Sequence, residues 1–151
     1  MSLEELVKDV MKNINQTVDL DASAKTSAAV MRKKGIGSLV VVQGGTAVGI
    51  VTERDLVSRV IADGLDPAKV LVRDIMSTPL ITIQPDAKIA EAARLMNEYK
   101  IRRVVVTAAD GSLAGIVTAS DLARVLAERK DYSDMTLNAI ARASPDKGPY
   151  Q

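Results

Sequence analysis

The sequence contains an internal repeat, and this duplication constrains the fold more than any other feature. Shifted by 65 positions, the 151-residue chain aligns with itself, so that VKDVM at 7–11 falls on VRDIM at 72–76. One inserted residue then changes the offset to 66, and GIVTERDL at 49–56 falls on GIVTASDL at 115–122. The match extends through roughly 57 residues of each copy with a single change of length, which indicates an internal duplication. The chain therefore folds as two similar units.

Each copy predicts the element order β-α-β-β-α. A short extended stretch (15–18; 80–83) precedes a helix, and a run of β-branched residues (39–42; 104–107) follows that helix. The helices are predicted from apolar and small residues at the spacing i, i+3, i+4, i+7. These residues are Ala24, Ser27, Ala28 and Met31 in the first copy, and Ile89, Ala92, Ala93 and Met96 in the second.

A tight hairpin is predicted after the β-branched run of each copy. Gly44-Gly45 and Asp110-Gly111 supply the positive φ that such turns require. The repeated eight-residue motifs at 49–56 and 115–122 are called the first and second octets. The apolar half of each octet completes the hairpin, and a second helix is expected to begin near Thr52 or Thr118. Met11, Met31, Met76 and Met96 recur at matching positions and are expected to fill the core.

The predicted fold class is α/β (α+β), with two β-α-β-β-α repeats. We expect residues 1–65 to form the first repeat with an N-terminal helix, and residues 66–130 to form the second. Asp66-Pro67 resembles an N-cap followed by proline at the first helical position, which predicts a short linker helix. The polar segment 131–151 is expected to form one further helical segment, at 132–141, and a partly disordered tail.

The composition excludes several classes of function. Cys and His are both absent, which removes thiol chemistry, imidazole catalysis and most soft metal sites. We therefore expect no catalytic residues, no metal and no cofactor. The formal net charge of +1 argues against binding to nucleic acid through phosphates. The apolar runs are far too short to span a membrane, and the charged start is unlike a secretory signal, so we expect a cytoplasmic protein.

The Thr and Asp at fixed spacing in both octets have two compatible interpretations. A Thr followed three residues later by an acid, where a strand passes into a helix, is close to a capping box. The same junction offers free N–H donors and a positive potential, which suits a phosphate or sugar. An Asp one turn into the helix can also accept hydrogen bonds from a vicinal diol.

The ordered set of motifs, occurring twice, resembles a tandem pair of cystathionine-β-synthase (CBS) domains, also called a Bateman module. The resemblance covers roughly residues 6–129 and rests on the DVM and DIM openings, GIGSLVVV and IRRVVVT, and the closing GIVTxxDL. It implies that the repeats pack their sheets about a pseudo-twofold axis. It further implies two clefts between the repeats that bind an adenosyl ligand (AMP, ADP, ATP or S-adenosylmethionine), with the Asp taking the ribose diol.

Carried over residue by residue, the resemblance implies two sets of site residues. The first cleft would use Thr52, Arg54, Asp55, Ile14, Gln16, Ile36, Gly37, Arg102 and Arg103. The second would use Thr118, Ser120, Asp121, Pro79, Ile81, Ile101 and Ser38. Arginine suits forked phosphate contacts, and the first cleft draws on more of them, so we expect it to bind phosphorylated adenosine better. The alternative is that Arg102 or Arg103, at the start of a strand, is only a solvated surface charge and binds no phosphate.

The predicted function is a regulatory, non-enzymatic module that senses adenine nucleotides. It would signal by conformational change to a separate, unknown effector protein, and would assemble as a homodimer, as members of the family often do. The alternatives are an S-adenosylmethionine sensor and a scaffold or dimerisation protein whose clefts are vestigial. Neither nucleic acid nor a membrane is expected as a partner.

Overall fold

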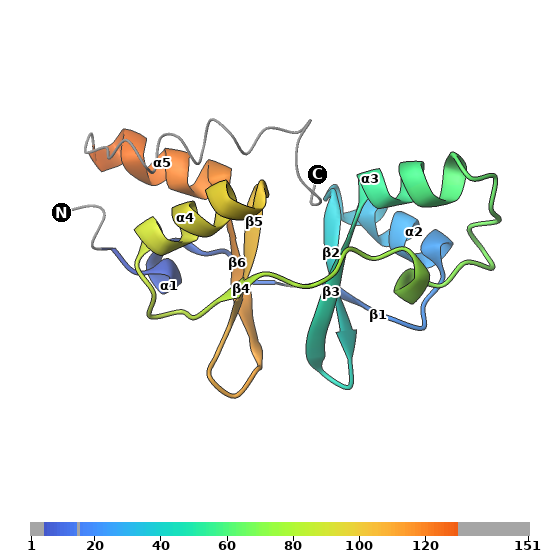
Figure 1. The fold of residues 1–151 in the computed structure, drawn as a ribbon, viewed down its shortest axis with the longest axis horizontal. Coiled ribbons are helices and arrows are strands. Elements are labelled where there is room, and N and C mark those ends of the chain that lie inside the picture. The colour runs from blue at the N-terminus through green and yellow to red at the C-terminus, as the bar shows by residue number, and fades with distance from the viewer. Residues whose placement is uncertain (1–4, 15, 130–151) are drawn as a thin grey trace. The chain divides into compact units, whose positions relative to one another are not determined.

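The computed structural model describes residues 5–14 and 16–129, which form two compact units (Figure 1). These units do not follow the order of the chain. The first-repeat unit comprises residues 16–80, and the second-repeat unit comprises residues 5–14 together with 81–129. The segment that precedes each repeat in the sequence thus packs in the unit of the other repeat. The helix and tail expected within 131–151 lie outside the described residues.

The first-repeat unit contains a three-stranded sheet in the order β1-β2-β3. Strand β1 is parallel to β2, and β2 is antiparallel to β3. Helix α2 contacts β2, and α3 contacts β3 and α2. The elements are β1 (Thr17–Asp19), α2 (Ala24–Lys34), β2 (Ser38–Gln43), β3 (Thr46–Thr52), α3 (Glu53–Leu56), the π-helix η2 (Val57–Ile61) and the 3-10 helix η3 (Val72–Asp74).

The second-repeat unit has the same plan, with a sheet in the order β4-β5-β6. Helices α4 and α5 contact each other and the strands β5 and β6, and α1 contacts α5 and β6. The elements are α1 (Val7–Val10), β4 (Thr82–Ile83), α4 (Ile89–Tyr99), β5 (Arg103–Thr107), β6 (Leu113–Thr118) and α5 (Ala119–Arg129). The α/β fold class and the predicted β-α-β-β-α order of each repeat are confirmed.

Local signals set most of these boundaries. The Ser23 side chain caps α2 by accepting from the backbone N–H of Thr26 at 3.1 Å, and Gly35 ends the helix with φ of 66°. Gly44 and Gly45 have φ of 58° and 83°, as a two-residue hairpin turn requires. In the second copy Gly111, at φ of 87°, lies in a longer loop between β5 and β6.

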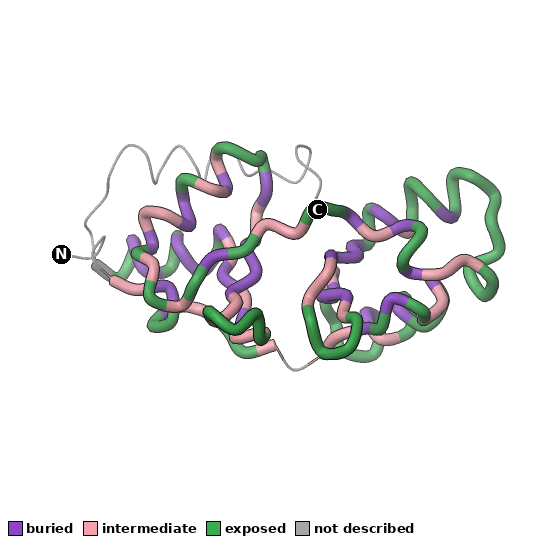
Figure 2. Tube along the Cα trace, turned by 60° about the horizontal axis from the view of Figure 1, so that its bottom comes forward, coloured by how far each residue is buried: buried purple, intermediate pink, exposed green. Residues whose placement is uncertain are grey.

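Each unit has a buried interior, and Figure 2 shows exposed positions following the loops and outer helix faces. Met31 and Met96 are buried, as predicted, whereas Met11 and Met76 are only half-buried. The core cluster of the first-repeat unit consists of Val18, Leu20, Ala24, Met31, Leu39, Val41, Val51, Val60, Val72 and Ile75.

The predicted linker helix at Asp66-Pro67 is wrong. The backbone forms a single turn there, in which the N–H groups of Lys69 and Val70 both donate to Asp66 O. The chain then turns back to the first repeat, where the N–H of Ala24 donates to Val70 O at 2.8 Å and Ser23 pairs with Leu71. A capping signal was present, but this early return leaves too few residues to propagate a helix.

Candidate functional site

The octet of the first repeat places Thr52 at the junction of β3 and α3. Thr52 has extended backbone angles (φ −122°, ψ 166°) and is the N-cap of α3. Its Oγ1 accepts from the N–H of Asp55 at 3.2 Å, and its own N–H donates to Asp55 Oδ2 at 2.8 Å. Both halves of the predicted capping box are therefore present.

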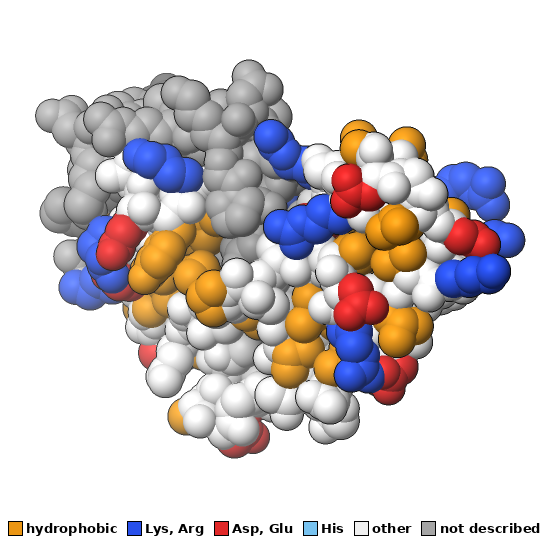
Figure 3. Space-filling view, turned by 45° about the vertical axis from the view of Figure 1, so that its right-hand side comes forward, with side chains coloured by type: hydrophobic (Ala, Val, Ile, Leu, Met, Phe, Trp, Pro, Cys, Tyr) orange, Lys and Arg blue, Asp and Glu red, His pale blue; other side chains and the backbone are white. Residues whose placement is uncertain are grey.

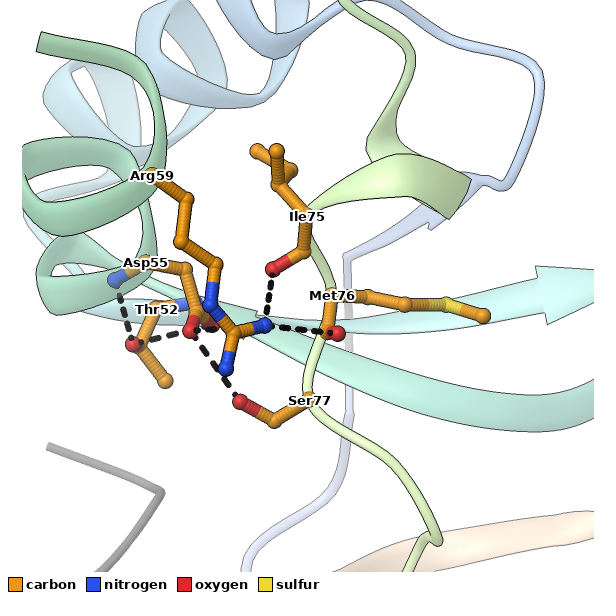
Figure 4. Close-up of polar contacts among 6 residues, drawn as sticks. All are labelled: Thr52, Asp55, Arg59, Ile75, Met76 and Ser77. Carbon is orange, nitrogen blue, oxygen red and sulfur yellow. Dashed lines mark hydrogen bonds and ion pairs between the residues drawn. The ribbon is translucent and has the colours of Figure 1, made fainter. Parts of the chain in front are cut away.

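The Asp55 carboxylate lies inside a dense set of internal contacts (Figure 4). Besides the Thr52 N–H, Oδ2 accepts from the Thr52 hydroxyl at 3.1 Å, and Oδ1 accepts from the Ser77 hydroxyl at 3.1 Å. Arg59 Nη1 lies 3.8 Å from Oδ1 and also donates to the carbonyls of Ile75 and Met76 at 2.9 and 3.1 Å. Asp55 is only 4% exposed. Burial raises the pKa of its carboxyl, an effect that these hydrogen bonds and Arg59 oppose.

Ser77 reaches Asp55 because its segment pairs with β3 beside a glycine. The N–H of Ser77 donates to Ile50 O at 2.8 Å, and the N–H of Ile50 donates to Ser77 O at 3.3 Å. A Cβ on the preceding Gly49 would lie 2.8 Å from Met76 Sδ and 3.1 Å from Ser77 O. The glycine of the first octet is therefore required by this close approach, because a side chain there would displace the segment.

The second octet repeats this architecture around Gly115. The N–H groups of Lys12 and Ile116 each donate to the other's carbonyl at 2.9 Å. A Cβ on Gly115 would lie 2.7 Å from Lys12 O and 2.8 Å from Met11 Sδ. The segment Met11-Lys12 therefore lies on the second octet as Met76-Ser77 lies on the first.

Asp121, the counterpart of Asp55, has a different environment. It completes a capping box, in which the N–H of Thr118 donates to Asp121 Oδ2 at 2.9 Å and the N–H of Asp121 donates to Thr118 Oγ1 at 3.1 Å. Asp121 Oδ1 lies 3.5 Å from Lys12 Nζ and 3.1 Å from Arg124 Nη2. The carboxylate is fully buried, and among the described residues Oδ1 accepts no hydrogen bond. Lys12 occupies the place that Ser77 holds in the first repeat.

Comparison with known proteins agrees with this duplicated geometry. The model of the CBS domain matches residues 7–62 and 72–128, which is most of the chain. The chain belongs to the CBS domain family. The uncharacterized protein MK0525 of Methanopyrus kandleri is 42% identical over 113 residues, which cover 71% of this chain and 58% of that protein. This chain therefore spans little more than half the length of that relative.

Solved CBS structures share the fold. The CBS domain pair of protein MJ0100, solved with 5′-methylthioadenosine and S-adenosyl-L-methionine, has a TM-score of 0.73 at 28% identity. The match covers 83% of this chain and 98% of that one. CBSX2 in complex with AMP has a TM-score of 0.70 at 26% identity, with the same coverage of both chains. Relatives with this fold thus bind adenosyl ligands.

The other site residues expected from the CBS resemblance are divided between the two units. In the first-repeat unit, the N–H of Glu53 donates to Gly37 O at 3.0 Å, which places Gly37 beside the start of α3. Ile36, Arg54 and Pro79 are exposed there, while Gln16 and Ser38 are half-buried.

In the second-repeat unit, the N–H of Ala119 donates to Arg102 O at 2.8 Å, the counterpart of the Gly37 contact. Ile101 is fully buried and Ser120 is exposed. Ile14, Ile81, Arg102 and Arg103 are half-buried. Each predicted cleft combines residues of both units, so its full lining stays a prediction.

Sequence reasoning missed the residues that contact the two carboxylates: Arg59, Ser77, Lys12 and Arg124. Ser77 and Lys12 carried a usable signal, since each directly follows the repeated DIM or DVM motif and they align at the offset of 65. Arg59 and Arg124 lie four and three residues after their aspartates, within reach on the same helical stretch.

No helix within the described residues is long and apolar enough to cross a membrane. The described parts of the chain also hold no group of three or more acidic side chains placed to bind a metal ion.

Proposed function

We propose that this CBS pair is a regulatory module that binds an adenine nucleotide and has no catalytic activity of its own. The observation that carries the proposal is the Thr–Asp pair at the strand-to-helix junction of both repeats, Thr52–Asp55 and Thr118–Asp121. The complexes of related CBS proteins with AMP and with S-adenosyl-L-methionine support an adenosyl ligand. Both junctions combine helix N–H groups with an acceptor for sugar hydroxyls.

Ligand binding would change the population of conformations that a partner recognises. The partner in this proposal is a separate effector protein in the cytoplasm. AMP has about 23 non-hydrogen atoms, and about 0.3 kcal/mol per atom gives a dissociation constant on the order of 10 μM. That affinity suits a sensor of cellular nucleotide levels.

Isothermal titration calorimetry of nucleotide-stripped protein tests this function. AMP, ADP, ATP and S-adenosylmethionine are titrated separately, and we expect saturable heat with at least one adenine nucleotide. Measurable turnover of ATP by the pure protein would contradict a purely regulatory role. Absence of heat with all four ligands at millimolar concentration would refute adenosyl sensing.

A scaffold with vestigial sites is the second candidate, and the contacts of Asp55 favour it. Three hydrogen bonds within the protein already engage this carboxylate, which is consistent with a purely structural role. A scaffold predicts that Asp55→Asn and Asp121→Asn change stability without changing the binding of any adenosyl ligand. A sensor predicts that at least one of them weakens binding.

We also propose that the module forms a homodimer. Val57 and Ile61, one turn apart on η2, are 56% and 70% exposed, although apolar side chains of this size are usually buried. Leu65, just beyond, is 47% exposed. Figure 3 shows apolar side chains exposed between charged ones on this side of the molecule. Self-association would remove such side chains from water.

A further inference from the structure

We propose that Lys12 is a specificity-determining residue, and that it makes Asp121, rather than Asp55, the carboxylate used by a phosphorylated ligand. The inference rests on the proposed nucleotide-binding function and adds which repeat binds and what the ligand must carry. It reverses the order of affinity expected from the distribution of arginines in the sequence.

The first reason is the difference in hydrogen bonding between the two carboxylates. Asp55 accepts from the Thr52 N–H, the Thr52 hydroxyl and the Ser77 hydroxyl. Asp121 accepts one hydrogen bond, to Oδ2, while Oδ1 accepts none from the described residues although it is fully buried. Its neighbours there are ion-pair partners, Arg124 Nη2 and Lys12 Nζ, and neither forms a hydrogen bond to this oxygen. A ligand hydroxyl could therefore donate to Asp121 Oδ1 without displacing a hydrogen bond, whereas at Asp55 it would have to displace Ser77.

The second reason is the charge beside each carboxylate. Lys12 Nζ and Arg124 Nη2 lie 3.5 and 3.1 Å from Asp121 Oδ1, and their side chains are 63% and 48% exposed. Two partly exposed cations thus lie beside the buried carboxylate, and the lysine is not held by a hydrogen bond to it. An ammonium on a flexible stem can turn to a phosphate at small cost.

In the first repeat, the cation beside the carboxylate is Arg59, and other contacts already hold it in place. Arg59 Nη1 donates to the carbonyls of Ile75 and Met76, and it lies 3.8 Å from Asp55 Oδ1. The residue aligned with Lys12 is the neutral Ser77. At the carboxylates themselves, the first repeat therefore has a fully hydrogen-bonded aspartate and a tethered arginine, while the second has an acceptor and a lysine able to move. Arg54, exposed on α3, is a further cation of the first repeat, but within the described residues the ion pair of Asp55 is with Arg59.

Matched variants of the two repeats test the inference. Asp121→Asn and Asp55→Asn are titrated with AMP by calorimetry, beside the wild-type protein. We expect Asp121→Asn to weaken AMP binding on the order of ten- to a hundredfold, as for a lost hydrogen bond to a charged group, and Asp55→Asn to change it less than about threefold. The reverse order, or an unchanged affinity in Asp121→Asn, would overturn the inference; unchanged affinity is also the result expected if only water occupies Oδ1.

The role of Lys12 is tested with a pair of ligands that differ in charge. Lys12→Ser copies the first repeat into the second, at a side chain exposed enough that folding should be retained. We expect this variant to weaken AMP about tenfold and to leave 5′-methylthioadenosine, which has no phosphate, within about twofold. Equal losses for both ligands, or no loss for either, would overturn anion selection by Lys12.

The reciprocal variant Ser77→Lys removes a donor from Asp55 and adds a cation. If wild-type protein binds AMP at one site per chain, we expect Ser77→Lys to add a second, weaker site. An unchanged stoichiometry would show that the residue at this position does not decide occupancy and would count against the inference. Failure of the wild-type protein to bind any adenosyl ligand would refute the proposed function itself, and so is distinguishable from these results.

Discussion

The Ser77 hydroxyl donates to Asp55 Oδ1 over 3.1 Å and joins the start of α3 to a segment 22 residues further along the chain. The contact depends on the pairing of Ser77 with Ile50, which in turn depends on the missing side chain of Gly49. One glycine thus determines how a buried carboxylate in the same unit is hydrogen-bonded.

Removal of that hydroxyl should destabilise the protein. Ser77→Ala leaves Asp55 with one donor fewer in a buried position, and we expect the free energy of unfolding to fall by about 1–2 kcal/mol. Urea denaturation followed by circular dichroism measures the change. Ser120→Ala, at an exposed position, is the control and should alter stability by less than about 0.5 kcal/mol. Equal effects of the two substitutions would show that the Ser77 hydrogen bond contributes nothing to stability.

The raised pKa of Asp55 predicts a pH dependence of stability. In the folded protein the pKa of this carboxyl lies above its ordinary value of 3.8, because burial disfavours the charged form. Its contribution to stability is therefore fully present below 3.8 and is lost as the pH rises through the folded pKa. Relative to Asp55→Asn, the wild-type protein should become less stable between acidic and neutral pH. Paired urea titrations measure the free energy of unfolding of both proteins, and a rise in the wild-type value relative to Asp55→Asn with increasing pH would contradict the prediction.

A side chain at Gly49 or Gly115, the glycines that begin the two octets, should destabilise the protein. A Cβ at Gly49 would lie 2.8 Å from Met76 Sδ, and a Cβ at Gly115 would lie 2.7 Å from the backbone oxygen of Lys12. We expect Gly49→Ala and Gly115→Ala each to lower the melting temperature, with a loss of about 1–3 kcal/mol. Gly37→Ala is the matched control, because its new Cβ would meet only the Glu53 side chain, at 3.3 Å. A loss in the control as large as in the octet variants would rule out the close approach as the cause.

Self-association should depend on the exposed apolar residues of η2. Ile61→Glu introduces a charge at a position that is 70% exposed, so it should convert a dimer to a monomer without lowering stability. Analytical ultracentrifugation measures the state, and the aligned Ala127→Glu in the second repeat, also at an exposed position, is the control. A wild-type monomer, or a dimer unaffected by Ile61→Glu, would exclude this surface as the interface.

Features that depend on near neighbours in the chain were predictable. The helix containing Met31 and that containing Met96 follow from residue spacing, and the Gly44-Gly45 hairpin follows from the need for positive φ. The capping boxes at Thr52 and Thr118 were predictable for the same reason, since both partners lie within one helical turn. The predicted linker helix at Asp66 does not form. The chain instead turns back to the first repeat, where Val70 O accepts from the N–H of Ala24, and this long-range contact outweighs the local capping signal.

The sequence by itself determined the duplication, the order of elements in each repeat and the Thr–Asp pairs, because these rest on periodicity and on contacts within a few residues. Only the tertiary structure decided that Lys12 lies beside Asp121 and Ser77 beside Asp55. Those contacts follow from which segment pairs with which octet, and no local pattern specifies a pairing between distant residues. The two aspartates are therefore alike in sequence and unlike in environment.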